Sequence, residues 1–295
     1  MKLNRPTLAL TALILAVSTF AFSQAPADDV DKTFMWKAES EGTTVYLVGS
    51  IHALREDAYP LPQPIESAFD EVEVVVFEID VDDMTQAAIE MMAAGTLEEG
   101  RTLEEVVGPE TWFELKVHAG PLGLDPAFFS GMKPWMAALT LAAFELTKHG
   151  YLATAGLDTY FSQKADESGK DRLALETAAF QVSLFADLTP EQSLAFLRHT
   201  LTDLETVIPE MERLYRDWRS GKVAPLQELL LEGFEEFPAV FKRMVVDRNR
   251  AWMPKITELL EGDRNAMVVV GSMHLVGEEG VVALLRQQGF TVEQQ

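Results

Sequence analysis

The 295 residues suffice for one large domain or two small ones, and a hydrophobic content of 47% excludes a disordered chain. The formal net charge of −23 argues against partners such as nucleic acid or an anionic membrane surface. The chain has no cysteine, which excludes disulfides, thiolate nucleophiles, iron–sulfur clusters and zinc–thiolate sites. Any metal ion must therefore be bound by histidines and carboxylates.

The first residues have the pattern of an export signal. Two basic residues precede an apolar stretch, Leu8–Phe22, which is short for a membrane span and runs into a small-x-small sequence. We therefore expect a signal peptide over residues 1–23, a polar linker over 24–32 and a single domain over 33–295. The mature protein is expected to be periplasmic or secreted, without stable membrane insertion after signal cleavage.

The predicted domain begins with strands. Residues 34–38 and 43–48 predict two strands that turn at Gly42 as an antiparallel hairpin. A helix is expected to start at Pro64. The segment 74–80 opens with four apolar residues in a row, which is typical of a strand covered on both faces.

The middle of the chain is predicted to be mostly helical. Residues 83–150 and 190–245 carry helical patterns separated by prolines and glycines. Methionines are frequent in the first of these segments, and we expect Met84, Met91 and Met92 to pack in the core rather than to bind copper.

The remaining elements alternate between helix and strand. We expect a helix over 158–169 with Asp158 as N-cap, a strand over 172–176, a helix from Thr177, a capping box at Thr189–Gln192, a helix over 244–262, a strand over 266–270, a helix through 281–285 and a last strand over 290–292. The predicted fold class is α/β (mixed α+β). Its central mixed sheet comes from the N- and C-terminal parts of the chain, with flanking helices and a large helical insertion.

Two of the five histidines repeat one sequence pattern. Val45–His52 and Met267–His274 each contain four apolar residues followed by Gly-Ser-apolar-His. Random placement of 18 glycines and 5 histidines in 295 residues gives roughly 0.3 Gly-x-x-His matches, so the shared serine and strand pattern make the pair unusual. The other three, His118, His149 and His199, are expected on solvated helix surfaces.

Each repeated histidine is expected just past the carboxyl end of a buried strand, where open α/β sheets place their ligands. We therefore expect His52 and His274 to meet in one site. Glu78 and Glu176 also follow apolar strands, and a buried carboxylate must be paired, protonated or bound to metal. Two histidines and one glutamate would suit a divalent metal ion that activates water, with the second glutamate as general base.

Structural roles compete with these assignments. Each histidine alone would more often cap its strand, and Glu78 could be a structural carboxylate. Arg248 could hold a substrate carboxylate, pair with Glu78 or lie at the surface. A serine nucleophile is not favoured, because the sequence has no G-x-S-x-G elbow and the two repeated serines suit hydrogen bonds to turn backbone.

The sequence resembles the TraB/GumN family, and the resemblance covers residues 33–293. It is carried by the two Gly-x-x-His motifs, the strand ending in Glu78, Lys133-Pro134-Trp135, Gly156-Leu157-Asp158, Leu175-Glu176-Thr177, Gln181, Arg248-Asn249 and Gly289-Phe290-x-Val292. This family is similar to the Tiki metalloproteases and, more distantly, to erythromycin-esterase-like and ChaN-like proteins. The resemblance implies a mixed α/β fold in which His52, Glu78 and His274 hold a divalent metal such as manganese or cobalt for peptide hydrolysis.

Three functions remain open from the sequence. The first is an exported metal-dependent hydrolase, a Tiki-like peptidase that uses manganese, cobalt or zinc, with Glu78, Glu176 and Arg248 as catalytic residues. The second is a metal-free, esterase-like hydrolase with a histidine as general base. The third is a non-catalytic periplasmic protein that binds a peptide or haem. The identity of the peptide or small-molecule substrate is left open.

Overall fold

The computed structural model describes residues 32–232, 234 and 237–295. The signal peptide predicted over 1–23, and all but the last residue of the predicted linker, lie outside the described residues. Within the described part, no helix is long and apolar enough to cross a membrane.

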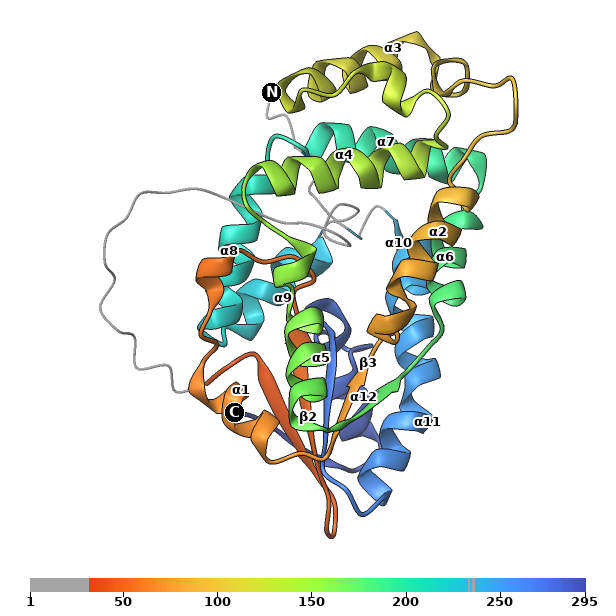
Figure 1. Cartoon of the computed structure of the whole chain (residues 1–295). Helices are drawn as coiled ribbons and strands as arrows, with labels where there is room; N and C mark the ends of the chain where they lie inside the picture. The colour runs from red at the N-terminus through yellow and green to blue at the C-terminus, as the bar shows by residue number, and fades with distance from the viewer. Residues whose placement is uncertain (1–31, 233, 235–236) are drawn as a thin grey trace, which may run out of the picture.

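The strands of the described residues form one six-stranded mixed sheet in the order β4-β3-β5-β2-β1-β6 (Figure 1). Their bounds are β1 Met35–Glu39, β2 Thr44–Ser50, β3 Val74–Phe77, β4 Asp171–Ala174, β5 Ala266–Gly271 and β6 Thr291–Gln294. Neighbours among β4, β3, β5 and β2 are parallel, whereas β1 is antiparallel to both β2 and β6. The carboxyl ends of four parallel strands therefore meet at one edge of the sheet.

The two repeated segments lie side by side at the centre of this sheet. β2 pairs with β5 in a register that places Ser50 opposite Gly271. Every residue of β5 is buried, as is every residue of β3, which agrees with the uninterrupted apolar runs in both strands. The expected sheet from the two ends of the chain is confirmed, and so is the antiparallel hairpin of β1 and β2.

Helices account for most of the remaining described residues. Their bounds are α1 Gln63–Asp70, α2 Met84–Ala94, α3 Leu103–Ala119, α4 Pro134–Lys148, α5 Leu157–Ser168, α6 Ala178–Ala186, α7 Pro190–Asp203, α8 Val207–Arg219, α9 Val223–Glu232, α10 Pro238–Phe241, α11 Asp247–Glu261 and α12 Val281–Gln287. A π-helical segment, Lys242–Val246, leads into α11, and a 3-10 helix, Ser272–Leu275, follows β5.

The helices are arranged in two groups around the sheet (Figure 1). Helix α5 packs against β3, β4 and β5, while α11 contacts β2 and α12. The helical middle of the chain lies beyond the carboxyl edge of the parallel strands, with α3, α4 and α7 farthest from the sheet. The predicted helical insertion is therefore confirmed, and it stands over the edge at which the repeated histidines are expected.

Several local predictions can be compared with the structure. The capping box is confirmed, because Thr189 and Gln192 exchange side-chain and backbone hydrogen bonds at the start of α7. The N-cap predicted for α5 is wrong: Gly156 occupies that position, and Asp158 lies in the first turn. The surface position predicted for His199 is also wrong, since its side chain is 11% exposed and pairs with Asp203.

The core position predicted for Met84 and Met92 of α2 is wrong as well, whereas Met91 is partly buried and packs against the core. This helix has no buried residue, and Met84 and Met92 are 43% and 67% exposed. Its apolar residues lie beyond the carboxyl edge of the sheet, where α2 packs against α6. An apolar pattern alone predicted burial, but here the neighbouring elements leave much of the helix uncovered.

Candidate functional site

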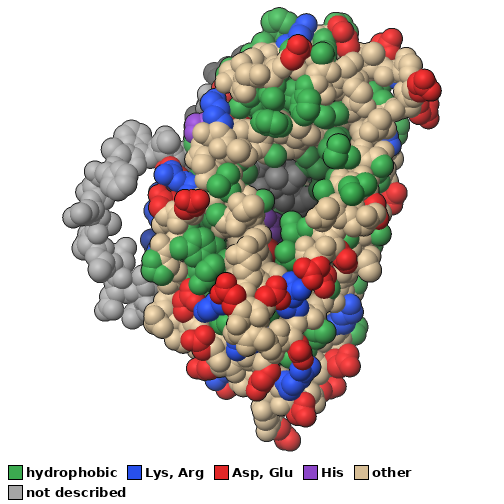
Figure 2. Space-filling view, viewed as in Figure 1, with side chains coloured by type: hydrophobic (Ala, Val, Ile, Leu, Met, Phe, Trp, Pro, Cys, Tyr) green, Lys and Arg blue, Asp and Glu red, His purple; other side chains and the backbone are tan. Residues whose placement is uncertain are grey.

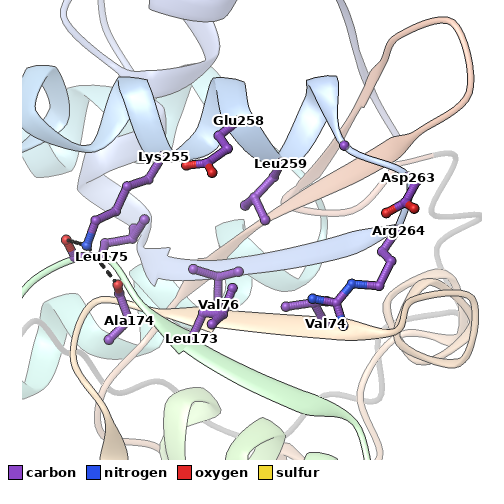
Figure 3. Close-up of a pocket in the computed structure, with 11 residues that line it drawn as sticks. Val74, Val76, Leu173, Ala174, Leu175, Lys255, Glu258, Leu259, Asp263 and Arg264 are labelled. Carbon is purple, nitrogen blue, oxygen red and sulfur yellow. Dashed lines mark hydrogen bonds between the residues drawn. The ribbon is translucent and has the colours of Figure 1, made fainter.

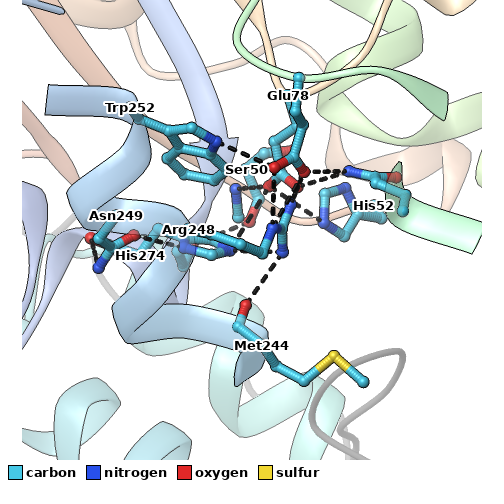
Figure 4. Close-up of polar contacts among 12 residues, drawn as sticks. Ser50, His52, Glu78, Met244, Arg248, Asn249, Trp252 and His274 are labelled. Atoms are coloured by element: carbon cyan, nitrogen blue, oxygen red, sulfur yellow. Dashed lines mark hydrogen bonds and ion pairs between the residues drawn. The ribbon is translucent and has the colours of Figure 1, made fainter. Parts of the chain in front are cut away.

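The ends of three neighbouring strands place three of the predicted residues together. His52 follows β2, Glu78 follows β3, and His274 lies in the 3-10 helix after β5. Glu78 Oε1 is 3.9 Å from His52 Nε2 and 3.9 Å from His274 Nε2 (Figure 4). The two histidines are 222 residues apart in the sequence, and the parallel pairing of β2 with β5 brings them together.

Glu78 is buried and fully hydrogen-bonded. Its Oε1 atom accepts from the backbone N–H of Gly271 at 2.8 Å, while Oε2 accepts from Gln181 at 3.1 Å and from Arg248. Burial is the largest single effect and would raise the pKa of Glu78. The Arg248 guanidinium, the two histidines and the Gly271 N–H together outweigh it and hold that pKa well below its ordinary value. The carboxylate is therefore ionised at neutral pH.

Arg248 joins both predicted glutamates. Its guanidinium pairs with Glu78 and with Glu176, and its Nη1 atom also donates to the Met244 carbonyl at 3.1 Å (Figure 4). Met244 belongs to the π-helical segment before α11, and such segments often occur at functional sites. Burial opposes the charge on Arg248, but the two carboxylates more than offset it and raise its pKa.

Glu176 has its oxygen atoms occupied. Besides Arg248, it accepts from Trp252 Nε1 at 3.0 Å and from Gln181 Nε2 at 3.0 Å. A general base needs a free lone pair toward its substrate. The hydrogen bonds thus favour a role for Glu176 in holding Arg248, and its catalytic role stays a prediction.

His52 is the open member of the histidine pair. Its side chain is 49% exposed, and its Nδ1–H donates to Asp158 at 2.8 Å. Asp158 also accepts from the Ser50 hydroxyl at 2.6 Å. The Asp158 carboxylate raises the pKa of His52 to about 9, against the effect of burial. Since Nδ1 is held by Asp158, Nε2 faces Glu78.

His274 is the closed member. Its side chain is 6% exposed, and Nδ1–H donates to the Asn249 side-chain oxygen at 2.6 Å. The Asn249 amide is oriented by its own donation to the carbonyls of His274 and Glu279. Burial, with the nearby Arg248 charge, lowers the pKa of His274 to about 3, so the ring is neutral at pH 7.

The arrangement of lone pairs fits a divalent cation. Asp158 and Asn249 each hold a histidine Nδ1, which directs the two Nε2 atoms toward Glu78. A cation would have to displace the Nε2 proton that a pKa of about 9 leaves on His52 at neutral pH. As they stand, no three histidine or acidic side chains of the described residues are close enough together to enclose an ion. One contact must also be exchanged, because Arg248 Nη1 donates to His274 Nε2 at 3.1 Å.

Gly271 leaves room at the centre of this group. A Cβ atom there would lie 3.2 Å from His52 Nε2, 3.3 Å from Glu78 Oε1 and 3.6 Å from the His274 ring. The space between the three predicted ligands thus accepts a small group only because this residue has no side chain. Gly156 is needed for a different reason, since a Cβ there would collide with the His52 carbonyl.

The histidine site opens into a cavity of about 310 Å³ that is lined by His52, Glu78, Asp158, Gln181 and Arg248 on its polar side. A larger hollow of about 470 Å³ lies between α11 and strands β3 and β4 (Figure 3). That hollow contains none of these residues, and Lys255 on its rim donates to the carbonyls of edge strand β4 and its neighbour Leu175. The smaller cavity is therefore the candidate site, because it contains the ionisable side chains and the larger hollow does not contain them.

The predicted site residues His52, Glu78, Glu176, Arg248 and His274 all meet here. Sequence reasoning did not identify the holding roles of Asp158, Gln181 and Asn249. The position of Asp158 at the start of a helix hid its role, because an acidic residue there is adequately explained by the helix dipole. Asn249 and Gln181 lie inside helices, where their periodicity gave no sign that they face a histidine or a glutamate.

Comparison with known proteins relates the chain to two named proteins and to one family. The chain is 27% identical over 241 residues to the uncharacterized protein YbaP of Escherichia coli, covering 82% of this chain and 87% of that protein. It is 23% identical over 327 aligned positions to the metalloprotease TIKI1 of Danio rerio, covering 92% of this chain and 64% of that protein. No solved structure matches it significantly. The model of the TraB/PrgY/gumN family matches residues 34–294, and the chain therefore belongs to that family.

Proposed function

We propose that this protein is a metal-dependent hydrolase that cleaves peptide bonds, with His52, His274 and Glu78 as the residues that would hold a divalent cation. The observation that carries the proposal is the convergence of both histidine Nε2 atoms on Glu78 Oε1, each at 3.9 Å. The similarity to a protein named a metalloprotease supports the choice of reaction. When bound, a divalent cation supplies Lewis-acid activation of water and of a carbonyl oxygen.

The chain's own residues would prepare the site for that chemistry. Asp158 and Asn249 orient the rings of the two histidines through their Nδ1 atoms. Arg248 keeps Glu78 ionised and lines the cavity. The N–H that now donates to His274 would be released when that histidine holds a metal, and it could then donate to negative charge that develops on a substrate carbonyl. Glu176 and Trp252 hold this guanidinium in place.

The metal requirement is tested by binding before activity. Protein purified without chelators is titrated calorimetrically with manganese, cobalt and zinc, next to His52→Ala, His274→Ala and the control His149→Ala. His149 is an exposed histidine paired with Glu145 at 3.0 Å and lies outside the site. We expect one equivalent of bound metal in the wild type and in the control, and none in the other two variants. Binding that survives both site substitutions contradicts the proposal.

A metal-free hydrolase is the second candidate, and one contact favours it. Arg248 already occupies the lone pair of His274 Nε2, while the open His52 is paired with Asp158. With a pKa of about 9, His52 would act as general base in alkaline solution, where its Nε2 is unprotonated. Hydrolysis that persists after exhaustive chelation, and that is lost in His52→Ala, would support this candidate over the first. A bound ligand recovered unchanged, or a haem absorption band in the purified protein, would instead support a binding protein without turnover.

We also propose that the protein is exported, on the basis of the signal pattern over residues 1–23. Cell fractionation with a C-terminal tag, combined with sequencing of the mature amino terminus, tests this proposal. Cleavage after Ser23 and recovery outside the cytoplasm are expected. An intact amino terminus in the cytoplasmic fraction would contradict it.

A further inference from the structure

The cavity that holds the histidine site has two unlike sides. One side carries the ionisable residues of the site, and the other is formed by apolar side chains from the helical middle of the chain. The apolar side includes Met84 and Met91 of α2, Leu139 of α4, and Leu184 and Phe185 of α6. We refer to these five residues as the apolar wall. A group bound at the histidines would thus have this wall as its neighbour.

Charge is confined to one side of the cavity. The ionisable residues that line it are His52, Glu78, Asp158 and Arg248, and none lies on the apolar wall. Gln181 is the polar lining residue nearest to that wall in the sequence, and its amide is already used by Glu78 and Glu176. A charged or strongly polar group placed against the wall would therefore lose its hydration without gaining a partner.

Helix α2 exposes more apolar surface than its position in the fold requires. None of its residues is buried, although Met84, Ile89, Met91 and Met92 all lie on it. Figure 2 shows apolar side chains gathered around the upper middle of this face of the molecule. Surface of this kind that adjoins a polar site is typical of ligand contact.

We propose that the apolar wall is a specificity subsite that accepts an apolar side chain next to the scissile bond of a peptide substrate. This inference rests on the proposed hydrolase function and adds the substrate class. The apolar wall lines the same cavity of about 310 Å³ as His52, Glu78 and Arg248. When the scissile amide lies at these residues, the substrate residue next to that amide therefore contacts the wall. Because methionine side chains are flexible, the subsite tolerates several apolar shapes, such as leucine, methionine and phenylalanine.

The test measures binding, so that it does not depend on turnover. Three peptides carry a ketomethylene group in place of the scissile amide, with leucine, lysine or glutamate on both sides of it. Their affinities are measured by calorimetry with the full chain. We expect the leucine peptide to bind at least about 10-fold more tightly than the glutamate peptide, the discrimination that a hydrophobic pocket provides.

Two neighbouring residues of α2 give a matched pair of variants. Met91 lines the cavity, whereas Met92 is 67% exposed and does not line it. Met91→Glu should weaken binding of the leucine peptide by about 10-fold or more and improve binding of the lysine peptide. Met92→Glu should leave both affinities unchanged. Met91 is partly buried and Met92 is exposed, so the unfolding temperature of each variant is measured to separate a loss of peptide affinity from a loss of folded protein.

Three outcomes overturn the subsite. These are equal affinities for the three peptides, equal losses in Met91→Glu and Met92→Glu, and a failure of all three peptides to bind. The proposed hydrolase function fails separately, when the amide versions of the peptides bind with the leucine preference but are never cleaved. The two results therefore distinguish a wrong subsite from a wrong reaction.

Discussion

His52 and His274 follow neighbouring parallel strands within the same local sequence pattern, yet the side chain of His52 is 49% exposed and that of His274 is 6% exposed. The holding groups differ in charge as well. Asp158 is a carboxylate and raises the pKa of His52 to about 9, whereas the neutral Asn249 leaves burial to lower the pKa of His274 to about 3. Identical motifs thus give an open, basic histidine and a closed, neutral one.

The difference teaches that the partner of each histidine, rather than the motif, sets its chemistry. The closed half is tied into the Arg248 network and is part of the folded core. The open half faces the cavity and is free to exchange partners. Five substitutions can break or sharpen this comparison.

The largest effect is expected from Arg248. In Arg248→Ala two buried carboxylates lose their cation, which should cost about 3–5 kcal/mol in the free energy of unfolding. Arg248→Lys keeps the charge but cannot bridge Glu78 and Glu176 as a planar fork does, so its loss should be smaller. Urea unfolding of chelator-treated protein measures both. If Arg248→Ala is as stable as the wild type, then the network of His274, Arg248 and the two glutamates does not stabilise the fold.

The glycines of the two motifs should respond in opposite ways. A Cβ at Gly49 would run into the Phe34 ring and lie 2.8 Å from Ser272 Oγ, so Gly49→Ala should lose about 1–3 kcal/mol through overpacking. Gly271→Ala should change stability less, because its nearest neighbours lie 3.2 Å and 3.3 Å away, but the added methyl group enters the space between the predicted ligands.

Calorimetric titration with manganese and urea unfolding separate these two outcomes. Gly271→Ala should lose metal affinity while remaining folded, and Gly49→Ala should lose stability. The reverse pattern would show that the glycine after β5 serves packing rather than the site.

The smallest expected effect on folding comes from Asp158→Asn, which should lower the pKa of His52 from about 9 toward its ordinary value of 6.5. Because the folded pKa is the higher one, the His52–Asp158 pair stabilises the fold fully below pH 6.5, and this contribution is lost as the pH rises through about 9. Because His52 is partly exposed to solvent, the contribution of this pair to the free energy of unfolding is reduced. Proton-coupled ring shifts in chelator-treated protein report the pKa directly.

The closed histidine supplies the control for that experiment. The folded pKa of His274 lies below 6.5, so its neutral form stabilises the fold above pH 6.5, and this contribution is lost on acidification toward pH 3. Asp158→Asn should flatten the stability profile between pH 6.5 and 9 and leave the acidic side unchanged. An unchanged His52 pKa in this variant would contradict the role of Asp158.

Prediction from sequence succeeded where the governing interactions are local. The apolar runs of β3 and β5, the hairpin of β1 and β2 and the capping box at Thr189 depend on residues a few positions apart. It failed for His199 and for Met84 and Met92 of α2, because their burial depends on which distant helices cover them. Periodicity indicates that a face is apolar, and it does not indicate what packs on that face.

The sequence by itself determined that His52, Glu78 and His274 each follow a buried strand, since runs of apolar residues and the glycine after them are local signals. Parallel pairing then brings such strand ends to one edge. Only the tertiary structure decided that Asp158 and Asn249 hold the two histidines and that Arg248 joins both glutamates. These contacts span 25 to 170 residues, and their charges and burial exist only once α5 and α11 are packed against the sheet.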